Sequence, residues 1–381
     1  MFEYVLGHLD FIWNYLLPFL VVLSVLVFVH EWGHYQVARW CGVKVDVFSI
    51  GFGPEIFGWN DRRGTRWKFS LIPLGGYVKM LGDMDASSAR STLEGIAPEL
   101  RDQAFPAKSV GQRAAIVFAG PAVNFIFAIL ILGGIYNIWG QPYTEAVIGS
   151  IAENSAAAEA KLRVGDKILE IDGAPIYRFE DVQRIIQVGA GQPVELKIQR
   201  AEEILAVPIT PKIVAAEDRF GNQHRLPRLG VMSTQTAYEQ HGFFASFYYA
   251  GKETYDLSLA TLKAVGQIIV GVRSVQELGG PLRIAQLSGQ AASIDYVALL
   301  GLIALLSINL GLINLFPVPL LDGGHLVFYA IEAVRGKPPN EQIMNAAAAI
   351  GVMAVGSLMV LAVYNDLAYF KFFDFVAKLF G

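Results

Sequence analysis

The sequence has few charged residues and almost no cysteine. Charged residues make up 17% of the 381 positions and apolar residues 54%, whereas soluble domains usually carry about 25% charged residues. This balance favours a membrane protein. The single cysteine, Cys41, excludes an intrachain disulfide framework and a cysteine-based zinc site. The net charge of −4 lacks the basic excess of a nucleic-acid-binding protein, so we expect no nucleic-acid partner.

Basic residues are missing from the N-terminal part of the sequence. No Lys or Arg occurs from Met1 to Ala38, so the basic region of a cleaved signal peptide is absent and we expect the first apolar stretch to be retained as a helix. Basic residues are frequent directly afterwards, between Arg39 and Lys79. Because cytoplasmic loops carry the excess of Lys and Arg, the first loop is predicted to be cytoplasmic and the N-terminus to lie outside.

Four apolar stretches are long enough to span a bilayer, which takes about 20 residues per helix. They run over residues 16–38, 114–139, 296–315 and 344–363. Four spans place the long middle segment and the C-terminus on the same outer side as the N-terminus. A fifth stretch, residues 243–272, carries Lys252, Glu253, Asp256 and Lys263. It is predicted to be an amphipathic helix at the membrane surface, because charges within a membrane helix are costly.

The loop between the first two spans is predicted to form β-hairpins. Residues 43–50 and 66–80 contain many β-branched and aromatic side chains around glycine-rich turns, a pattern typical of hairpins. Residues 48–53 are too apolar for a solvated loop. We therefore expect the region of residues 43–80 to associate with the membrane, where protein or water must satisfy its backbone polar groups.

Residues 144–212 of the outer segment show the pattern of a small α+β domain. Within it, residues 164–173 have the run hydrophobic-Gly-Asp-x-Ile-Leu-x-Ile-Asp-Gly, and residues 179–187 have helical spacing of apolar side chains. The run resembles that of PDZ domains in bacterial proteases. Such a domain binds peptide C-termini or extended peptides by strand addition, and we expect its groove between residues 146–151 and the helix. A pure spacer without ligand is the alternative. Residues 213–295 are predicted to be a linker that includes the amphipathic helix.

Two histidines and a glutamate interrupt the first apolar stretch. His30 and His34 are four positions apart, so on a helix both imidazoles lie on one face and can reach one zinc ion. Glu31 beside them can serve as the general base. Ionisable side chains within a membrane are costly and indicate a functional site. A structural cluster, in which the three side chains only satisfy one another, is the alternative.

A zinc site of this type needs a third protein ligand and leaves a fourth position for water. Asp322 is the better placed candidate, because Pro317 and Pro319 break the chain after the third span and expose backbone that is tolerated only around a buried site. His325 is also possible. His30 lies about 21 Å and Asn314 about 27 Å along helices that enter from the outer side. In a core roughly 30 Å thick both motifs fall in the cytoplasmic half.

Together these motifs resemble the site-2 protease family of intramembrane zinc metalloproteases (peptidase M50-like), in particular its bacterial RseP-type branch. The residues that carry the resemblance are His30, Glu31 and His34, the stretch 314–323, the PDZ-like run and the Gly120-Pro121-Ala122-Val123-Asn124 motif of the second span. The resemblance implies a metalloendopeptidase with one Zn²⁺ per chain, bound by His30, His34 and Asp322. It also implies that Glu31 takes a proton from the zinc-bound water.

The same resemblance implies a location in the bacterial inner membrane and substrates that are single-pass membrane proteins, such as an anti-sigma factor or a remnant signal peptide. Asn314 and Asn124 are implied to orient the substrate backbone or to stabilise the oxyanion, although each could equally steady a kinked helix. The hairpins near residues 48–53 and 67–76 could supply an edge strand that holds an extended substrate. Some members of this branch carry two PDZ domains, whereas this sequence shows one.

The predicted fold is an α-helical integral membrane protein with four transmembrane helices, a membrane-associated cytoplasmic β-hairpin region and one periplasmic α+β PDZ-like domain. Both termini are predicted to be periplasmic and the active site to lie toward the cytoplasmic side. A membrane metal carrier is a second interpretation, but it predicts several ligands along a pathway. A membrane-anchored PDZ peptide-binding module without protease activity is a third, and it leaves Glu31 and Asp322 in the bilayer unexplained.

Overall fold

The structure, a computed structural model, describes residues 12–82, 96–189, 191–217, 223–233, 235–271, 274–372 and 378. The predicted positions of the two chain termini fall on residues outside these ranges. The chain forms two compact units. The first comprises residues 1–132, 248–265 and 275–381, and the second comprises residues 133–247 and 266–274.

Four helices among the described residues are long and apolar enough to cross a membrane. They cover Trp13–Trp40, Val110–Ile138, Tyr296–Asn314 and Gln342–Tyr369, and each overlaps one predicted span. The corresponding elements are η1 (Ile12–Leu16), α2 (Leu17–Trp40), α3 (Val110–Ile138), α8 (Tyr296–Asn314) and α10 (Glu341–Tyr369). A helix satisfies its backbone polar groups internally, which is what a bilayer demands. The prediction of an α-helical membrane protein with four long apolar helices is therefore confirmed.

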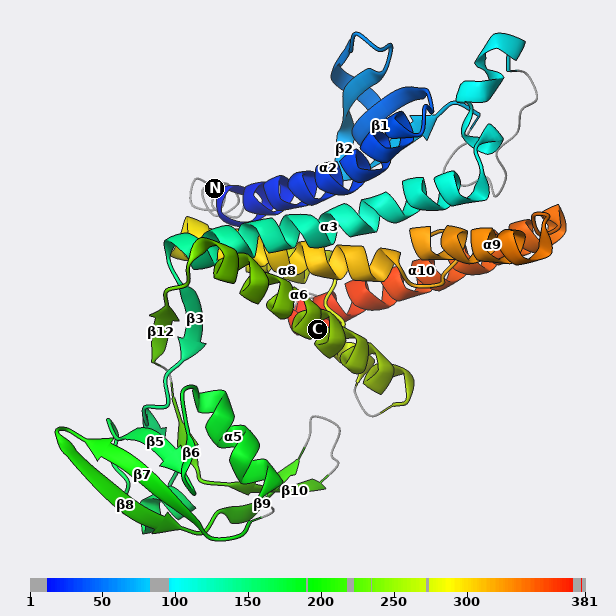
Figure 1. Cartoon of the computed structure of the whole chain (residues 1–381). Coiled ribbons are helices and arrows are strands. Elements are labelled where there is room, and N and C mark those ends of the chain that lie inside the picture. Colours follow the sequence, from blue (N-terminus) through cyan, green and yellow to red (C-terminus); the bar gives the residue numbers. More distant parts are fainter. Residues whose placement is uncertain are drawn as a thin grey trace. The chain divides into compact units, whose positions relative to one another are not determined.

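Helices α2, α3 and α8 lie side by side (Figure 1) because glycines stand where they meet. A Cβ atom on Gly33 of α2 would come within 2.5 Å of the Ala119 carbonyl oxygen of α3. A Cβ atom on Gly311 of α8 would come within 3.0 Å of the Pro121 carbonyl oxygen. Small residues allow membrane helices to approach closely. As a result α3 contacts the helices that carry the two predicted zinc-binding motifs.

Strands β1 (Val45–Asn60) and β2 (Arg66–Met80) pair antiparallel and fold back on themselves. Residues 47–50 of β1 pair with residues 76–79 of β2 on one side and with residues 66–69 on the other. Residues 57–60 pair with residues 66–69 as well. Residues 76–79 therefore form an edge strand, which has no second strand partner within the described part of the chain. The strands lie where the sequence predicts hairpins.

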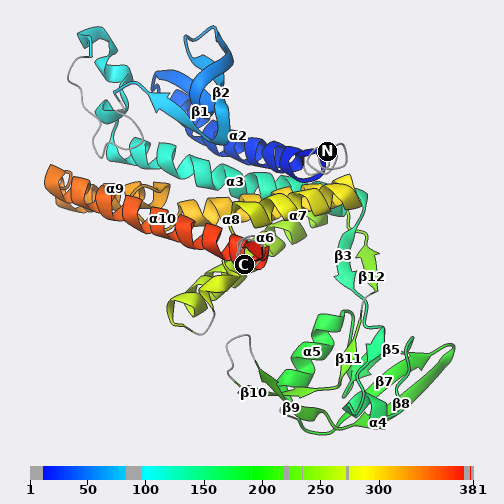
Figure 2. The same cartoon turned by 180° about the vertical axis from the view of Figure 1, so that it is seen from behind.

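The remaining helices of the first unit include one that differs from the sequence prediction. Helix α9 (Asp322–Arg335) lies between the third and fourth predicted spans, where the sequence analysis predicts no helix. The other elements are η2 (Pro98–Gln103), η3 (Phe105–Ala107), α6 (Phe243–Ile269), which extends into the second unit, η4 (Val275–Glu277) and α7 (Pro281–Ile294). Figure 2 shows α7, α8 and α10 from the side opposite to Figure 1.

The second unit contains an antiparallel sheet and one longer helix. The sheet has the order β6-β5-β7-β8. Its strands are β5 (Lys167–Ile171), β6 (Ala174–Pro175), β7 (Val194–Arg200) and β8 (Glu203–Ile209), and the helix is α5 (Phe179–Val188). The other elements are β3 (Gln141–Thr144), β4 (Ser150–Ile151), α4 (Ala156–Glu159), β9 (Lys212–Glu217), β10 (Gln223–Arg228), β11 (Val231–Met232) and β12 (Thr236–Glu239). Inward-facing apolar residues of β5 and β7, such as Ile168 and Leu196, form the core with Val182 of α5.

The core of this unit continues beyond residue 212. Leu229 is buried in it, Val231 packs against it, and β11 pairs antiparallel with β4. The segment that supplies this strand comes after the stretch 144–212, which contains the PDZ-like run. Sequence alternation did not reveal it, because β11 has only two residues and follows a glycine.

Candidate metal centre

The structure brings His30, His34 and Asp322 together. The two Nε2 atoms are 3.2 Å apart, and Asp322 Oδ2 lies 3.3 Å from Nε2 of His30 and 3.5 Å from Nε2 of His34. The three ligand atoms lie within 4.8 Å of one another. Asp322 Oδ2 is buried, and no hydrogen bond to it is made within the described part of the chain. Two imidazoles and an oxygen without a donor fit a zinc ion.

The hydrogen bonds of both histidines prepare the Nε2 atoms for a metal. The His34 Nδ1 atom is 2.9 Å from the carbonyl oxygen of Ile116 in α3, so Nδ1 carries the proton and the Nε2 lone pair faces Asp322. The His30 Nδ1 atom is 3.1 Å from the side-chain amide of Asn124. With the amide turned so that Oδ1 faces the ring, Asn124 accepts the proton of Nδ1. That turn gives a partner to Asn124 Oδ1, which is otherwise buried without one among the described residues.

Gly120 makes room for both imidazoles. A Cβ atom at this position would lie 2.5 Å from Cε1 of His34 and 2.9 Å from Cε1 of His30. The histidines can therefore lean against α3 and reach Ile116 and Asn124 only because residue 120 has no side chain. Gly120 belongs to the motif of residues 120–124, but its place in the sequence predicts no role for it. A glycine inside an apolar span was the available signal.

Asp322 stands at the first position of α9, after the loop of residues 315–321. The N-terminus of a helix favours a carboxylate. Cβ atoms on Gly323 and Gly324 would overlap carbonyl oxygens of this loop, those of Phe316 and Val318 among them, so the loop folds tightly onto the start of α9. Leu320 has a φ angle of 102°, an unfavourable conformation for a non-glycine residue and one that clusters at functional sites.

Glu31 points to a different neighbour, the β2 edge strand. The backbone N–H of Val78 lies within reach of the Glu31 carboxylate. Gly76 lies directly beside it, since a Cβ atom there would be 3.3 Å from Cγ of Glu31. The candidate general base is therefore held between the metal ligands and an edge strand.

The two asparagines lie on different sides of His30. Asn124 contacts its Nδ1 atom, while the Asn314 amide nitrogen lies 3.5 Å from its Nε2 atom, next to the proposed metal. His325 lies one turn after Asp322 in α9. Among the described residues no hydrogen bond joins its side chain to the three ligands.

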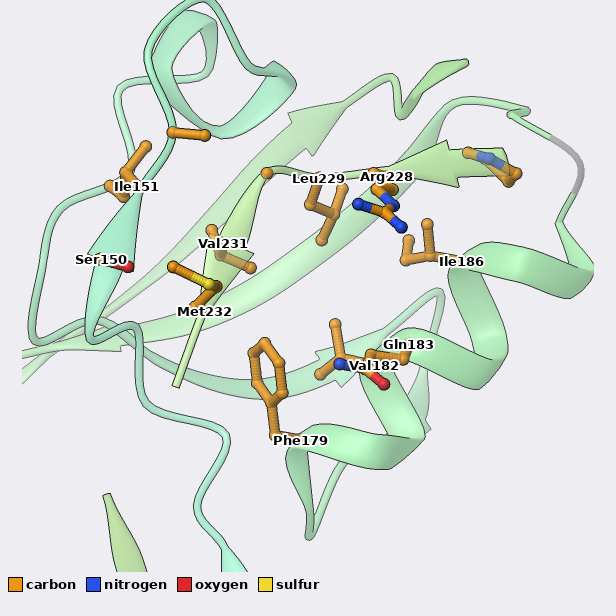
Figure 3. Close-up of a pocket in the computed structure, with 13 residues that line it drawn as sticks. Ser150, Ile151, Phe179, Val182, Gln183, Ile186, Arg228, Leu229, Val231 and Met232 are labelled. Carbon is orange, nitrogen blue, oxygen red and sulfur yellow. The ribbon is translucent and has the colours of Figure 1, made fainter. Parts of the chain in front are cut away.

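A separate hollow lies in the second unit, between β11 and α5. It has a volume of about 510 Å³, and its lining includes Phe179, Val182, Ile186 and Leu229. Figure 3 shows these apolar side chains facing one another, with Arg228 at one end. The strand that borders the hollow is β11, which lies between β4 and α5 (Figure 3). The hollow lies where the groove between residues 146–151 and the helix is expected, since Ser150 and Ile151 line it together with α5. Strand β11 is an additional wall, between β4 and α5, that the sequence did not predict.

Known proteins match almost the whole chain. Residues 18–358 match the family model of peptidase family M50. The chain is 43% identical, over 374 residues, to a candidate zinc metalloprotease of Agrobacterium fabrum, with 96% of this chain and 98% of that protein covered. It is 32% identical, over 454 residues, to the regulator of sigma-E protease RseP of Salmonella typhimurium, with 94% and 99% covered. The PDZ domain of the SdrC-like protein from Listeria innocua is similar to 25% of this chain, with 99% of that domain covered, 22% identity and a TM-score of 0.20.

Proposed function

This chain belongs to peptidase family M50, and from that premise we propose that it cuts single-pass membrane proteins in or beside their transmembrane segments. The enzyme is a zinc-dependent metalloendopeptidase with four long apolar helices. The observation that carries the proposal is the meeting of His30, His34 and Asp322 beside Glu31 and an open strand edge. Such an arrangement joins a hydrolytic centre to a place where an extended peptide can bind.

The proposed roles follow from the contacts of each side chain. His30, His34 and Asp322 hold the zinc, and their orientation comes from Asn124, from Ile116 and from the N-terminus of α9. A bound zinc ion supplies Lewis-acid chemistry, polarising the scissile carbonyl and the attacking water. Glu31 accepts the proton of that water and passes it to the leaving amine.

A substrate helix must be unwound before its peptide bonds can be cut, and residues 76–79 offer a way to hold the unwound chain. An extended peptide that added to this edge would run past Glu31, whose carboxylate already reaches Val78 of the same strand. The Asn314 amide lies beside the metal ligands, so we propose that it binds the substrate backbone or stabilises the oxyanion. Asn124 is assigned to His30 instead, because it lies behind that ring.

The outer surface of the hairpin indicates where it lies relative to the membrane. Several large apolar side chains of β1 and β2 are exposed, among them Ile56, Phe57 and Leu71. Exposed apolar surface of this kind is stable in contact with lipid. This observation supports a hairpin that enters the cytoplasmic leaflet of the inner membrane. The distribution of basic residues supports a periplasmic PDZ-like domain and periplasmic termini.

The hollow beside β11 is proposed to bind a peptide C-terminus or an extended peptide. In the antiparallel pair with β4 the backbone groups of alternate residues point outward, so β11 can add a further strand over the apolar floor. Arg228 is exposed at one end of the hollow and offers a guanidinium to a terminal carboxylate. Binding of a peptide to full-length protein, compared with its C-terminally amidated form, tests this role. Equal affinity for both forms, or no loss with Arg228→Ala, contradicts recognition of the terminal carboxylate, and no binding of either form contradicts the whole role.

Hydrolysis is tested with two substitutions in the metal centre. Glu31→Gln removes the base but no zinc ligand, so we expect cleavage of a single-pass substrate to be lost while zinc content stays at one per chain. Asp322→Ala removes a ligand and should lower zinc content itself. A Glu31→Gln protein that still cleaves would show that this glutamate is not the base. A wild-type protein that binds zinc and peptide but cleaves nothing would favour the peptide-binding module.

The strand-addition step is tested separately with proline, which removes a backbone donor from an edge. Val78→Pro should lower cleavage by about tenfold or more, as loss of substrate positioning does, with zinc content unchanged. Ile56→Pro is the matched control, because Ile56 is exposed and lies outside the pairs that residues 76–79 make. Equal turnover of the two variants would argue against substrate binding at this edge.

A further inference from the structure

A polar cluster outside the metal centre ties the β-hairpin to the catalytic helix. Asp61 lies in the turn between β1 and β2, and its Oδ1 atom accepts the backbone N–H groups of Arg63 at 2.8 Å and Thr65 at 2.9 Å. Its Oδ2 atom accepts the Tyr35 hydroxyl at 3.1 Å and the Trp67 indole N–H at 3.2 Å. A carboxylate has about four acceptor positions, so all of them are used.

Tyr35 is the partner that comes from α2. Its side chain is 8% exposed, and its ring packs edge-on against Phe48 and Trp67, with centroids 5.7 Å and 5.2 Å apart. The polar and apolar contacts of Tyr35 therefore go to the same hairpin. The hydroxyl adds direction to this contact, because apolar packing alone is non-directional.

The spacing along α2 shows what this contact can do. Val27, Glu31 and Tyr35 are four residues apart and lie on one face of the helix. This face contacts the hairpin at three successive turns of α2. Val27 lies against Gly76, Glu31 lies at the Val78 N–H, and Tyr35 binds Asp61. The Tyr35–Asp61 contact is therefore the last of three contacts along α2, and the general base Glu31 makes the middle one.

We propose that Asp61, acting through Tyr35, is a positioning residue that fixes where the β2 edge strand lies along the α2 axis relative to Glu31. It thereby selects which substrate peptide bond is cut. The inference rests on the proposed function, since it requires a substrate strand on this edge. Neighbouring residues of a strand are about 3.3 Å apart. A shift of the hairpin along α2 by that length places the next peptide bond at the site.

The physical basis is that residues 66–69, which follow the Asp61 turn, and the edge residues 76–79 both pair with residues 47–50, so the turn and the edge belong to one hydrogen-bonded unit. If the hydroxyl of Tyr35 is removed, the turn keeps its own hydrogen bonds to Arg63 and Thr65, but it loses the polar contact to α2. The hairpin then remains folded and rests on the helix by apolar packing, which tolerates sliding. His30 and His34 lie on another face of α2 and keep their partners in α3.

The experiment measures where, and how fast, the enzyme cuts. Tyr35→Phe, Asp61→Asn and the double variant are purified in detergent and given a single-pass substrate that the wild type cleaves, and the products are identified by mass spectrometry. We expect additional cleavage positions next to the original one and a kcat about 10- to 100-fold lower. The KM, zinc content and melting temperature should stay near the wild-type values. The double variant should behave like the more severe single variant, because both changes remove one shared contact.

Controls separate positioning from a general loss of polar groups. Tyr255→Phe and Asp102→Asn change the same groups at exposed sites elsewhere and should leave the cleavage pattern unchanged. If Tyr35→Phe cuts at the original bond only, the inference is overturned, whether kcat is normal or falls together with zinc content or melting temperature. If the wild type cleaves no membrane substrate at all, the proposed function fails first and this inference fails with it.

Discussion

The substitution Gly120→Ala offers a severe test of the metal centre, because it changes no ligand and adds one methyl group. The new Cβ atom would lie 2.5 Å from Cε1 of His34 and 2.9 Å from Cε1 of His30. Carbon atoms in contact are normally about 3.5–4.0 Å apart. At least one imidazole, or α3 as a whole, must therefore move by about 1 Å.

Such a movement is large on the scale of a zinc site. Zinc–nitrogen bonds are about 2.0–2.1 Å long, and sites tolerate deviations of about 0.2 Å. The movement also pulls the rings away from Ile116 and Asn124, and loss of an outer partner alone costs about 10- to 100-fold in metal affinity. We expect at least about 100-fold weaker zinc binding, which corresponds to about 2.7 kcal/mol.

The assay is competition for zinc with a chromogenic chelator, using purified protein in detergent. Gly134→Ala is the matched control, since it lies in the same helix and a Cβ atom there meets no atom of the described residues within 4 Å. The control should bind zinc like the wild type, and both proteins should have similar helix content. If Gly120→Ala bound zinc within about threefold of the wild type, the two histidines could not be the ligands in the arrangement described.

Three further predictions concern separate parts of the chain. Asn124→Ala should weaken zinc binding by about tenfold in the same competition assay, and unchanged affinity would remove its role at His30. Asp166→Asn should destabilise the PDZ-like domain by about 2 kcal/mol at pH 7, because the buried carboxylate binds Arg200 at 2.7 and 2.8 Å. Burial tends to raise the pKa of Asp166, but its bonds to Arg200 and the Arg163 N–H outweigh this and hold the pKa below the usual value. The stabilisation is therefore present above the ordinary carboxyl pKa and is lost as the pH falls through the lower pKa of Asp166 in the folded protein. The measurement is amide exchange of β5, and an equal difference between wild type and variant at pH 2 and pH 7 would contradict this prediction. Asp366→Ala removes an acceptor for the N–H groups of Gly280 and Leu282 at the start of α7, so amide exchange there should become about fivefold to tenfold faster, reflecting a lost cap of about 1 kcal/mol.

Those parts of the protein that depend on regular spacing follow from the sequence. A helix of 3.6 residues per turn puts His30 and His34 on one face, and bilayer thickness makes four stretches recognisable as spans. Proline and glycine mark the break at which Asp322 follows α8. These inferences need only the periodicity of a single segment, and for that reason the sequence was sufficient.

The structure was needed wherever two distant segments meet. The sequence contains Gly120, Asn124 and Ile116, but nothing in their spacing indicates that α3 lies against the two imidazoles. Likewise β11 was missed, because a two-residue strand has no periodicity, and it adds a wall to the groove that the sequence predicted between residues 146–151 and the helix.

Sequence alone thus determined which residues are chemically able to bind a metal and which segments are able to cross a bilayer, since both depend on residue type and local repeat. Only the tertiary structure decided which hydrogen bonds orient the ligands, which strand faces Glu31 and how Asp61 connects the hairpin to α2. Those contacts arise from close packing between elements that are far apart along the chain, and packing depends on the shapes of all the partners at once.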